Sequence, residues 1–282
     1  MEWKINSKDP KEIFLQAIEQ AELLVLGIGA GLPGSAGFGY SGERFEKNFG
    51  DFIKEYKLVD MLQASLFEYP NWPSYWAFQS RFTSINYYDQ PVSESFLKLK
   101  ELIKDKNYFI ITTNSDSCLE KANFDEDKIF YIQGKYKHFQ CSKMCHNKLY
   151  EDKELIYKMI KEQKDLLVPY ELIPRCPKCD SFLEINKRIA YKGMVEDQKF
   201  ENQKAKYEAF VEKAKDKKTL FLELGVGYTT PQFIKIPFQK WTQENPQSFY
   251  LSISNKTYRL NPQIKKQALL LEVDLKDFFE KF

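Results

Sequence analysis

The chain has 282 residues, of which 43% are hydrophobic and 16% aromatic, enough for a sizeable core in one main domain with a smaller insertion. Its 42 Lys and Arg nearly balance its 40 Asp and Glu, and no long basic run is interleaved with aromatics, so we expect no nucleic-acid surface. The first apolar run begins only at Leu23, too late for a secretory signal and too short for a membrane span. We therefore expect a cytoplasmic protein, without a membrane partner, that meets small molecules or other proteins.

The first elements are a helix and a buried strand. Apolar residues recur at helical spacing over residues 10–21, with Asp9 as the cap, and residues 23–28 are continuously apolar, as in a buried parallel strand. The strand leads into a glycine-rich stretch that begins Gly29, Ala30, Gly31. Glycine has no Cβ, so such a backbone can take positive φ angles and approach a pyrophosphate closely. An ordinary tight turn between strand and helix is the alternative interpretation.

Residues 45–90 are crowded with aromatic side chains at spacings that fit short packed helices. This pattern predicts a helical insertion that buries its own aromatics, with Pro70 and Pro73 breaking the helices locally. A stacking platform for nucleic-acid bases is the alternative, but no basic stripe accompanies the aromatics.

Polar residues follow the next two strands. A helix over residues 93–104 leads into the apolar strand 108–111, after which Asn114 and Asp116 stand where an open α/β sheet places its ligand-binding residues. A third short strand, 129–132, delivers Gln133 to the same edge. The plainer interpretation of Asn114 and Asp116 is that they cap the next helix. Cys118 fits a small buried residue on that helix.

The other four cysteines form two close pairs. Cys141 and Cys145 flank three residues, Cys176 and Cys179 flank two, and a charged, helix-like stretch lies between the pairs. Four thiolates at such spacing can hold a tetrahedral zinc ion, whose binding helps to fold a segment with little core of its own. The alternatives are four free thiols, or His146 in place of one thiolate. In a reducing compartment a metal site suits these pairs better than disulfides.

The C-terminal third returns to alternating strands and helices. A lysine-rich helix over 200–215 precedes the apolar strand 219–224, which ends in Gly225, Val226 and Gly227. A further strand, 248–254, ends at Ser254 and Asn255. Alternating elements with polar residues at the strand ends predict a Rossmann-like, doubly wound parallel sheet whose crevice holds a dinucleotide.

The order of these motifs resembles the sirtuin family over nearly the whole chain. The resemblance implies that residues 1–44, 91–136 and 186–282 form a Rossmann-like NAD-binding part, that 45–90 form a helical insertion and that 137–185 form a zinc-binding module. In sirtuins the first loop binds the phosphates of NAD, the asparagine and aspartate hold its nicotinamide end, and a His-Gly pair carries the general base. NAD and zinc are the implied cofactors.

Gln133, followed by Gly134, stands where a sirtuin carries its catalytic histidine. An amide cannot take a proton at neutral pH, so it can only orient and hydrogen-bond its neighbours. Together with the segments 40–45 and 223–227, this pair resembles the macrodomain-linked sirtuins of microbial pathogens, called class M. That resemblance implies a protein ADP-ribosyltransferase whose acceptor is a lipoyl-carrier protein related to the glycine-cleavage H protein. It also implies a partner macrodomain hydrolase that reverses the modification.

The resemblance also assigns residues. It implies that Asn114 positions water or ribose near the reacting carbon, that Asp116 holds the nicotinamide carboxamide, and that Gln133 orients ribose or acceptor. Ser254 or Asn255 would meet the adenosine ribose, with Asp274 a further position near adenine. In the loop over the cofactor, the cofactor-binding positions are Tyr40 and Arg44; Arg44 contacts phosphate or target, or else forms an exposed ion pair with Glu43.

Two other functions stay open at this point. A sirtuin-type deacylase or NAD hydrolase would be favoured by a histidine that enters the pocket from elsewhere, but the only two, His138 and His146, fall in or beside the zinc module. A non-catalytic NAD sensor would bind NAD and release no nicotinamide.

Overall fold

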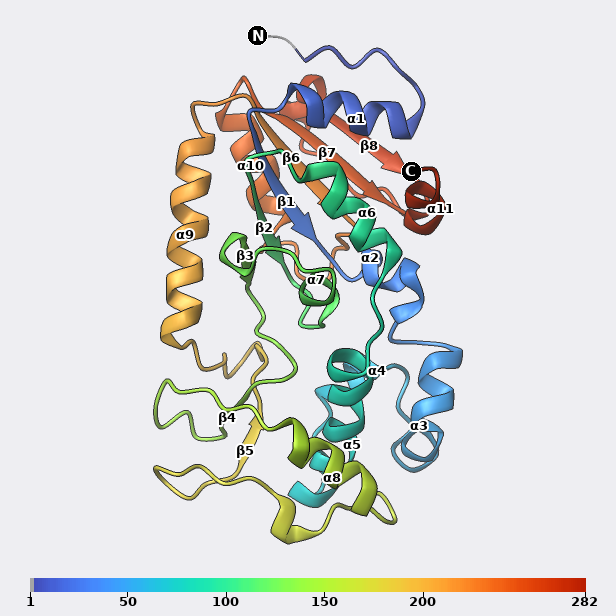
Figure 1. Ribbon diagram of the computed structural model, residues 1–282, viewed down its shortest axis with the longest axis vertical. Coiled ribbons are helices and arrows are strands. Elements are labelled where there is room, and N and C mark those ends of the chain that lie inside the picture. Colours follow the sequence, from blue (N-terminus) through green and yellow to red (C-terminus); the bar gives the residue numbers. More distant parts are fainter. Residues whose placement is uncertain (1–2) are drawn as a thin grey trace.

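The computed structural model describes residues 3–282, which form a two-lobed molecule (Figure 1). One lobe is built on a six-stranded sheet of order β3-β2-β1-β6-β7-β8, in which every neighbouring pair is parallel. The sheet strands are β1 (Leu23–Ile28), β2 (Tyr108–Thr112), β3 (Ile129–Tyr131), β6 (Thr219–Leu224), β7 (Phe249–Ser254) and β8 (Ala268–Glu272). Every residue of β1, β2, β6 and β7 is buried, as the continuous apolar runs predict. The Rossmann-like, doubly wound parallel sheet is confirmed.

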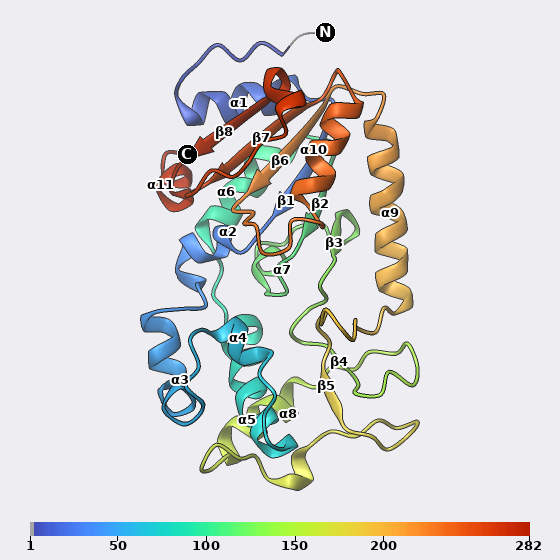
Figure 2. The same ribbon diagram turned by 180° about the vertical axis from the view of Figure 1, so that it is seen from behind.

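Helices cover both faces of this sheet (Figure 2). One face packs on α1 (Pro10–Gln20), α6 (Glu94–Ile103), α7 (Cys118–Lys121) and α11 (Leu275–Glu280); the other packs on α9 (Gln198–Ala214) and α10 (Lys235–Glu244). The predicted cap of the first helix is present, since Asp9 accepts hydrogen bonds from the backbone N–H groups of Lys11 and Glu12. Cys118 is buried on α7, as predicted.

The second lobe combines the helical insertion with the zinc module. It contains α3 (Glu43–Tyr56), α4 (Met61–Ser65), α5 (Trp72–Thr83), the π-helical turn Ser84–Tyr88, α8 (Lys153–Glu162) and the antiparallel pair β4 (Phe139–Cys141) and β5 (Leu183–Ile185). Trp76 of α5 packs edge-on against Phe139 at 5.0 Å and donates a hydrogen bond to the carbonyl of Leu183 at 3.1 Å. The insertion and the module therefore share one apolar core. The helical insertion is thus confirmed, and its aromatics serve the zinc module as well.

The expected role of the prolines in the insertion is confirmed for Pro70, which lies in the break between α4 and α5, and was wrong for Pro73. Pro73 lies in the first turn of α5 and Pro70 lies just before that helix. The first N–H groups of a helix have no partner inside it, so a proline there sacrifices no hydrogen bond and helps the helix to start. Within residues 3–282, none of the helices has the length and apolar character required to cross a membrane.

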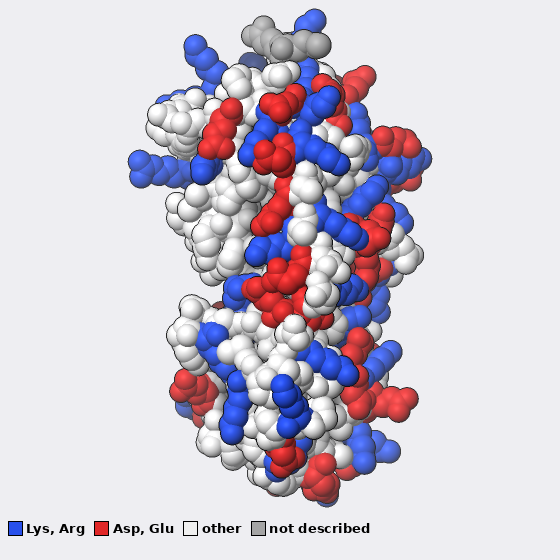
Figure 3. Space-filling model, turned by 90° about the vertical axis from the view of Figure 1, so that its left-hand side faces the viewer, with Lys and Arg blue, Asp and Glu red and all other residues white. Residues whose placement is uncertain are grey.

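The face that carries α9 mixes charges of both signs (Figure 3). Lys199 and Lys206 of α9 pair with Glu126 and Asp127 at 2.9 and 2.7 Å, in the short 3-10 helix Glu126–Lys128 before β3. These pairs tie α9 to the edge of the sheet, although such exposed pairs stabilise a fold only weakly.

Candidate active site

Two glycine loops cross at the carboxyl end of the sheet. A Cβ on Gly29 or Gly31 would lie 2.6–2.7 Å from backbone atoms of Gly225 or Val226, and Gly225 has φ +62° with its own Cβ position 2.3 Å from the nitrogen of Leu32. The glycines here are therefore required by the contact of one loop with the other. Positive φ, which we expected of the first loop, occurs in it only at Gly37. The first loop continues as the helical turns α2 (Gly31–Pro33) and Gly34–Phe38.

The crossing loops form the floor of a cleft. About 930 Å³, counting its opening to solvent, lies between residues 29–31, the end of β2, the end of β3 and residues 225–230. Gly31 and residues 225–227 also line a second hollow of about 680 Å³, which reaches Ser254, Asn255 and Asp274. Because the two hollows share these loop residues, they form one elongated groove at the switch point of the sheet, where such folds bind dinucleotides. The predicted positions brought together here are Gly29, Ala30, Gly31, Tyr40, Asn114, Gln133, Gly225, Val226, Gly227, Ser254 and Asn255.

Asn114 joins the end of β2 to the first loop. Its backbone N–H donates to the Thr112 hydroxyl at 3.0 Å, and its side-chain amide donates to the carbonyl of Gly29 at 3.0 Å. Neither bond caps a helix, so the capping interpretation does not hold for this residue.

Asp116 lies in the interior instead of on the cleft wall. One carboxylate oxygen accepts a hydrogen bond from the N–H of Cys118 at 2.8 Å, as a capping residue would, whereas the other oxygen is buried without a partner among residues 3–282. Burial raises the pKa of this carboxyl, and its charge is felt by Tyr40 and Tyr136, which line the cleft. An orphaned acceptor beside the cleft fits a ligand that offers an amide N–H.

Gln133 reaches the cleft from the end of β3. Its amide nitrogen lies 3.5 Å from the hydroxyl of Thr230, and its backbone carbonyl lies 3.5 Å from the hydroxyl of Ser115. Gly134 has φ +81°, and a Cβ there would come 2.6 Å from the side-chain oxygen of Asn186, so this turn requires glycine.

No histidine lines either hollow within residues 3–282. His146 lies among the zinc-module cysteines, with its Nδ1 3.1 Å from the sulfur of Cys145. His138 lies on the far side of Gly134, and burial, with lysines 137 and 135 nearby, lowers its pKa to about 4. The cleft therefore lacks the imidazole that a sirtuin-type deacylase needs.

Arg44 lies outside the cleft and supports the loop that carries Tyr40. Its guanidinium donates to the side chain of Asn86 at 2.8 Å and to the carbonyl of Ile85 at 2.9 Å, and burial lowers its pKa. It lines neither hollow, and within residues 3–282 it forms no ion pair with Glu43, so the expected exposed pair was wrong. Tyr40 of the same loop does reach the cleft, where its hydroxyl shares a hydrogen bond of 3.1 Å with that of Tyr136.

The sequence analysis did not identify two cationic residues that lie on the cleft wall. Lys187 is buried and donates to the carbonyl of Ser65 at the end of α4, and burial lowers its pKa to about 7. Arg188 donates to the carbonyl of Ile132 at 3.2 Å and pairs with Glu196 at 2.6 Å. One sequence signal could have identified them: they are two adjacent basic residues at the point where the chain leaves the zinc module.

The four paired cysteines meet in the second lobe. Their sulfur atoms all lie within 4.8 Å of one another, with Cys141 and Cys179 at 3.5 Å and Cys145 and Cys176 at 3.6 Å. Four thiolates at these separations suit a tetrahedral zinc ion with Zn–S bonds of about 2.3 Å. The predicted zinc-type cluster is confirmed, and the alternative of four unrelated thiols is wrong. His146 donates to, or accepts from, the hydroxyl of Tyr150 at 2.7 Å, which fits a residue that flanks the cluster.

Comparisons with known proteins agree with this geometry. No protein-family model matches the chain. It is 50% identical over 264 residues to a protein ADP-ribosyltransferase of Staphylococcus aureus (strain Mu50 / ATCC 700699), covering 94% of this chain and 84% of the relative. It is also 25% identical over 236 residues to a probable bifunctional ADP-ribose hydrolase/ADP-ribosyltransferase of Fusarium oxysporum f. sp. cubense, covering 78% of this chain but 38% of that longer protein.

Solved structures show the same fold. A Sir2 homologue in complex with NAD superposes with a TM-score of 0.64 at 14% identity, covering 98% of this chain and 93% of the other. A sirtuin whose structure concerns substrate affinity gives 0.61 at 18% identity, covering 95% and 96%. The sheet, the cleft and the cysteine cluster thus define a sirtuin fold. The chain belongs to the protein ADP-ribosyltransferases, so the prediction that it is an enzyme of this kind is confirmed.

Proposed function

We propose that this chain is an NAD-dependent protein mono-ADP-ribosyltransferase whose acceptor is a lipoyl-carrier protein related to the glycine-cleavage H protein. The observation that carries the reaction type is that Asn114 and Gln133 line one cleft in which no histidine stands among the described residues. Transfer to an external acceptor can proceed by orientation and charge stabilisation, whereas acyl migration onto a ribose hydroxyl needs a base. The acceptor class rests on the resemblance to macrodomain-linked sirtuins.

The reaction joins the acceptor to the ribose carbon that bears nicotinamide. A nucleophilic atom of the acceptor forms a bond to this carbon as the bond to the nicotinamide nitrogen breaks. The electron pair of the broken bond goes to nicotinamide, which leaves uncharged, and any proton on the acceptor atom passes to solvent. Positive charge develops on the ribose during this exchange, so fixed dipoles and aligned groups can lower the barrier.

Each part of NAD has a matching part of the groove. The crossed loops at residues 29–31 and 225–227 present backbone to the phosphates, and Ser254 or Asn255 lies at the adenosine end, with Asp274 beside them. At the other end, we assign the carboxamide N–H of nicotinamide to the unpartnered oxygen of Asp116, which is buried behind the cleft wall, so that nicotinamide has to enter beyond that wall to reach it.

Asn114 and Gln133 are assigned to the reacting centre. Asn114 is held in place by its bond to Gly29, so it can position the ribose or a water beside the reacting carbon. Gln133, whose amide nitrogen lies 3.5 Å from the hydroxyl of Thr230, can orient the ribose or the acceptor. The zinc cluster lies in the second lobe, away from these residues, and zinc bound there would help to fold the module after which the chain continues into Lys187 and Arg188.

We further propose that a partner macrodomain hydrolase removes the ADP-ribose. The Fusarium relative is described as both an ADP-ribose hydrolase and an ADP-ribosyltransferase, and it is much longer than the part that this chain matches. A relative that joins the two activities in one protein supports a functional pairing of transfer with removal.

The test is incubation of the purified chain with labelled NAD and a lipoylated carrier protein, in parallel with an unlipoylated carrier and an acetylated peptide. We expect nicotinamide release together with label on the lipoylated carrier. Loss of acetyl groups would establish a deacylase instead. Binding of NAD without nicotinamide release, in the presence of the lipoylated carrier, would contradict the transferase and favour a sensor.

A further inference from the structure

A buried ion pair lies just before the second glycine loop. Lys235, at the start of α10, donates a hydrogen bond to the carboxylate of Glu223 on β6, and the two side chains are only 2% and 0% exposed. The hydroxyl of Ser252 on β7 lies 3.5 Å from the same carboxylate. Glu223 stands two residues before Gly225, so the pair is placed where β6 enters that loop. Neither charged residue lines the cleft or the hollow that continues it.

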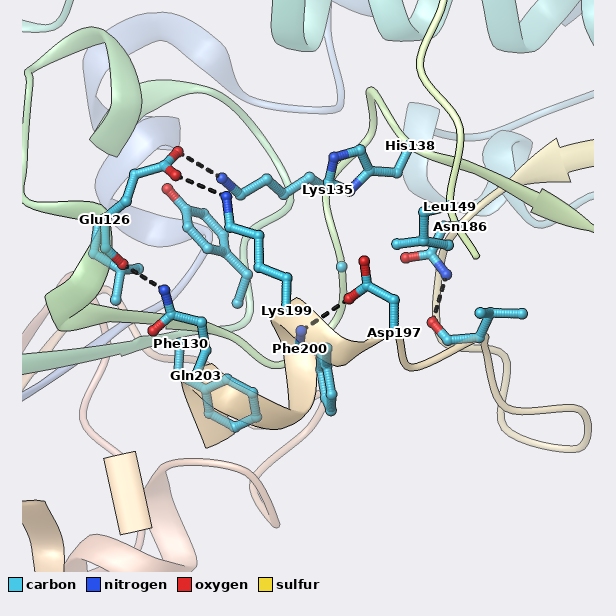
Figure 4. A pocket seen from close by; sticks show the side chains of 14 residues that line it. Glu126, Phe130, Lys135, His138, Leu149, Asn186, Asp197, Lys199, Phe200 and Gln203 are labelled. Carbon is cyan, nitrogen blue, oxygen red and sulfur yellow. Dashed lines mark hydrogen bonds and ion pairs between the residues drawn. The ribbon is translucent and has the colours of Figure 1, made fainter. Parts of the chain in front are cut away.

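Stability does not account for the burial of this pair. Figure 4 shows an ion pair of the other kind, at a pocket beside β3, where the carboxylate of Glu126 meets Lys135 and Lys199 at 3.1 and 2.9 Å. Lys199 is 62% exposed, so water still reaches its charge. Lys235 and Glu223 have both left water, and this costs so much solvation energy that two apolar side chains of the same size are often at least as stable. The buried pair therefore calls for another role.

The cation of the pair faces an aromatic ring at the adenosine end of the groove. The Nζ of Lys235 lies 5.1 Å from the centre of the Tyr258 ring, and Tyr258 lines the hollow at that end. The ring of Tyr228 stacks on Tyr258, with centres 5.8 Å apart and 23° between the planes. A cation attracts an aromatic ring more strongly when water is excluded. The carboxylate of Glu223 thus fixes the cation, and the cation fixes the ring.

This ring lies between two loops of the nucleotide groove. Tyr228 belongs to the loop after β6 and Tyr258 to the loop after β7, and the Tyr258 hydroxyl lies 3.7 Å from the position that a Cβ on Gly227 would take. Helix α10, which packs against the sheet (Figure 2), holds the loop after β7 a second time, because Gln239 accepts a hydrogen bond from the N–H of Asn261 at 2.8 Å. The separation of the two loops is therefore set from α10.

We propose that Lys235 and Glu223 are positioning residues for NAD, which act through Tyr258 to hold the two loops at the separation that the adenosine half requires. This role rests on the proposed placement of the adenosine half of NAD in this hollow, and it needs neither the acceptor nor the transfer step. Tyr258 forms part of the wall that the nucleotide meets, whereas the ion pair keeps that wall in place.

The experiment measures the binding of NAD and of ADP-ribose to the full zinc-loaded chain by calorimetry. Lys235→Met should raise both dissociation constants about tenfold, because Tyr258 loses the cation that holds it. Lys240→Met is the matched control, since Lys240 lies on the same helix with its side chain 68% exposed. We expect its dissociation constants to stay within about twofold of those of the unmodified chain.

Substitution of the ring tests the same contact from the other side. Tyr258→Leu removes the aromatic face and should weaken NAD about tenfold, whereas Tyr258→Phe keeps that face and should bind within about twofold of the unmodified chain. When Lys235→Met is added to Tyr258→Leu, we expect a further loss of less than about twofold, since the cation acts only through the ring. Two residues that merely stabilised the fold would show losses that multiply.

Removal of both charges separates positioning from stability. The double variant of Glu223→Leu and Lys235→Met leaves no buried charge unpaired, so its melting temperature should be close to that of the unmodified chain. Its binding of NAD should nevertheless be about tenfold weaker, because the cation is gone. This variant replaces Lys235→Met if the single change, which leaves Glu223 buried without its partner, prevents folding.

The proposal is overturned if the folded double variant binds NAD as tightly as the unmodified chain, or if the losses from Lys235→Met and Tyr258→Leu multiply. If neither charge variant folds, Tyr258→Leu decides alone, and an unchanged dissociation constant in that variant overturns the proposal. A chain that binds NAD normally, loses binding in these variants and yet labels no carrier protein would contradict the transferase while it supports the role of Lys235.

Discussion

The side-chain amide of Asn114 donates a hydrogen bond to the carbonyl of Gly29 at 3.0 Å, which links the end of β2 to the loop after β1. The catalytic candidate and the phosphate loop are therefore positioned by the same contact. Asn114 is buried, so this bond is shielded from water and helps to fix the loop before any ligand arrives.

Replacing Asn114 by alanine should impair catalysis far more than folding. We expect transfer to fall about 100-fold, because a group at the reacting centre is lost. The free energy of unfolding should fall by only about 1 kcal/mol, the typical contribution of one hydrogen bond. Nicotinamide release and urea unfolding measure the two effects. Asn114→Asp, which keeps the size, is the control, and full transfer by the alanine variant would remove Asn114 from the mechanism.

Gln133→Ala should lower transfer by about tenfold, because the variant can no longer orient the ribose or the acceptor. Thr230→Val is the matched change, since it removes only the hydroxyl that Gln133 contacts at 3.5 Å, and we expect a loss of about twofold to threefold. Labelled carrier protein is counted at saturating NAD. Equal activity of Gln133→Ala and the unmodified chain would show that the Gln133 amide has no role in the transfer reaction.

Cys176→Ser should release zinc and destabilise the chain by about 3 kcal/mol or more, because the second lobe depends on the metal for part of its folding energy. Cys118→Ser is the control, as that cysteine is buried on α7, outside the cluster. Atomic absorption gives the zinc content and thermal unfolding gives the stability. A stable, soluble Cys176→Ser protein without zinc would contradict a structural role for the metal.

Gly225→Ala should destabilise the crossing of the two loops by about 3 kcal/mol, since the residue has φ +62° and the new Cβ would lie 2.3 Å from the nitrogen of Leu32. Gly227→Ala is the comparison, because within 4 Å its Cβ would meet, in the described part of the chain, only the hydroxyl of Tyr258, at 3.7 Å. We expect this second change to cost less than about 1 kcal/mol. Similar melting temperatures for the two variants would refute the close packing of the loops.

Lys187 should make stability depend on pH. Burial lowers its pKa from the ordinary 10.5 to about 7, so between these values the unfolded chain binds a proton that the folded chain lacks. This residue's contribution to the free energy of unfolding therefore rises as pH increases from 7 towards 10.5, and it is constant below pH 7. Urea unfolding at pH 7 and pH 9 should show a smaller rise in Lys187→Met than in the unmodified chain. An identical rise in both proteins would mean that Lys187 titrates normally.

The strand ends explain why much of the site could be predicted from the sequence. Asn114 and Gln133 each follow a short apolar run, and parallel strands bring their carboxyl ends to one edge whatever the rest of the chain does. Lys187 and Arg188 could not be placed in this way, because their position depends on the path by which the zinc module returns to the sheet. Asp116 was expected at the cleft for the same reason as Asn114, yet the short turn into α7 takes its side chain inside.

For the second lobe, the sequence predicted which residues are buried but not which residues they pack against. The aromatics of residues 45–90 were expected to bury one another, and nothing in their spacing shows that Trp76 also meets Phe139. Apolar attraction has no direction, so a pattern identifies buried residues without naming their partners. Arg44 illustrates the converse: its neighbour Glu43 suggested a local pair, but its guanidinium bonds to Asn86, far along the chain.

Residues 45–90 and 137–185 share one apolar core, so the sequence of each segment is suited to the other. We therefore expect the two segments to change together between relatives. A chimera that took the zinc module from a relative but kept this insertion would place Trp76 against a module that lacks the matching partner surface of Phe139. Exchange of the lobe between family members therefore requires both segments together. Natural variation at one segment should then be accompanied by matching changes at the other.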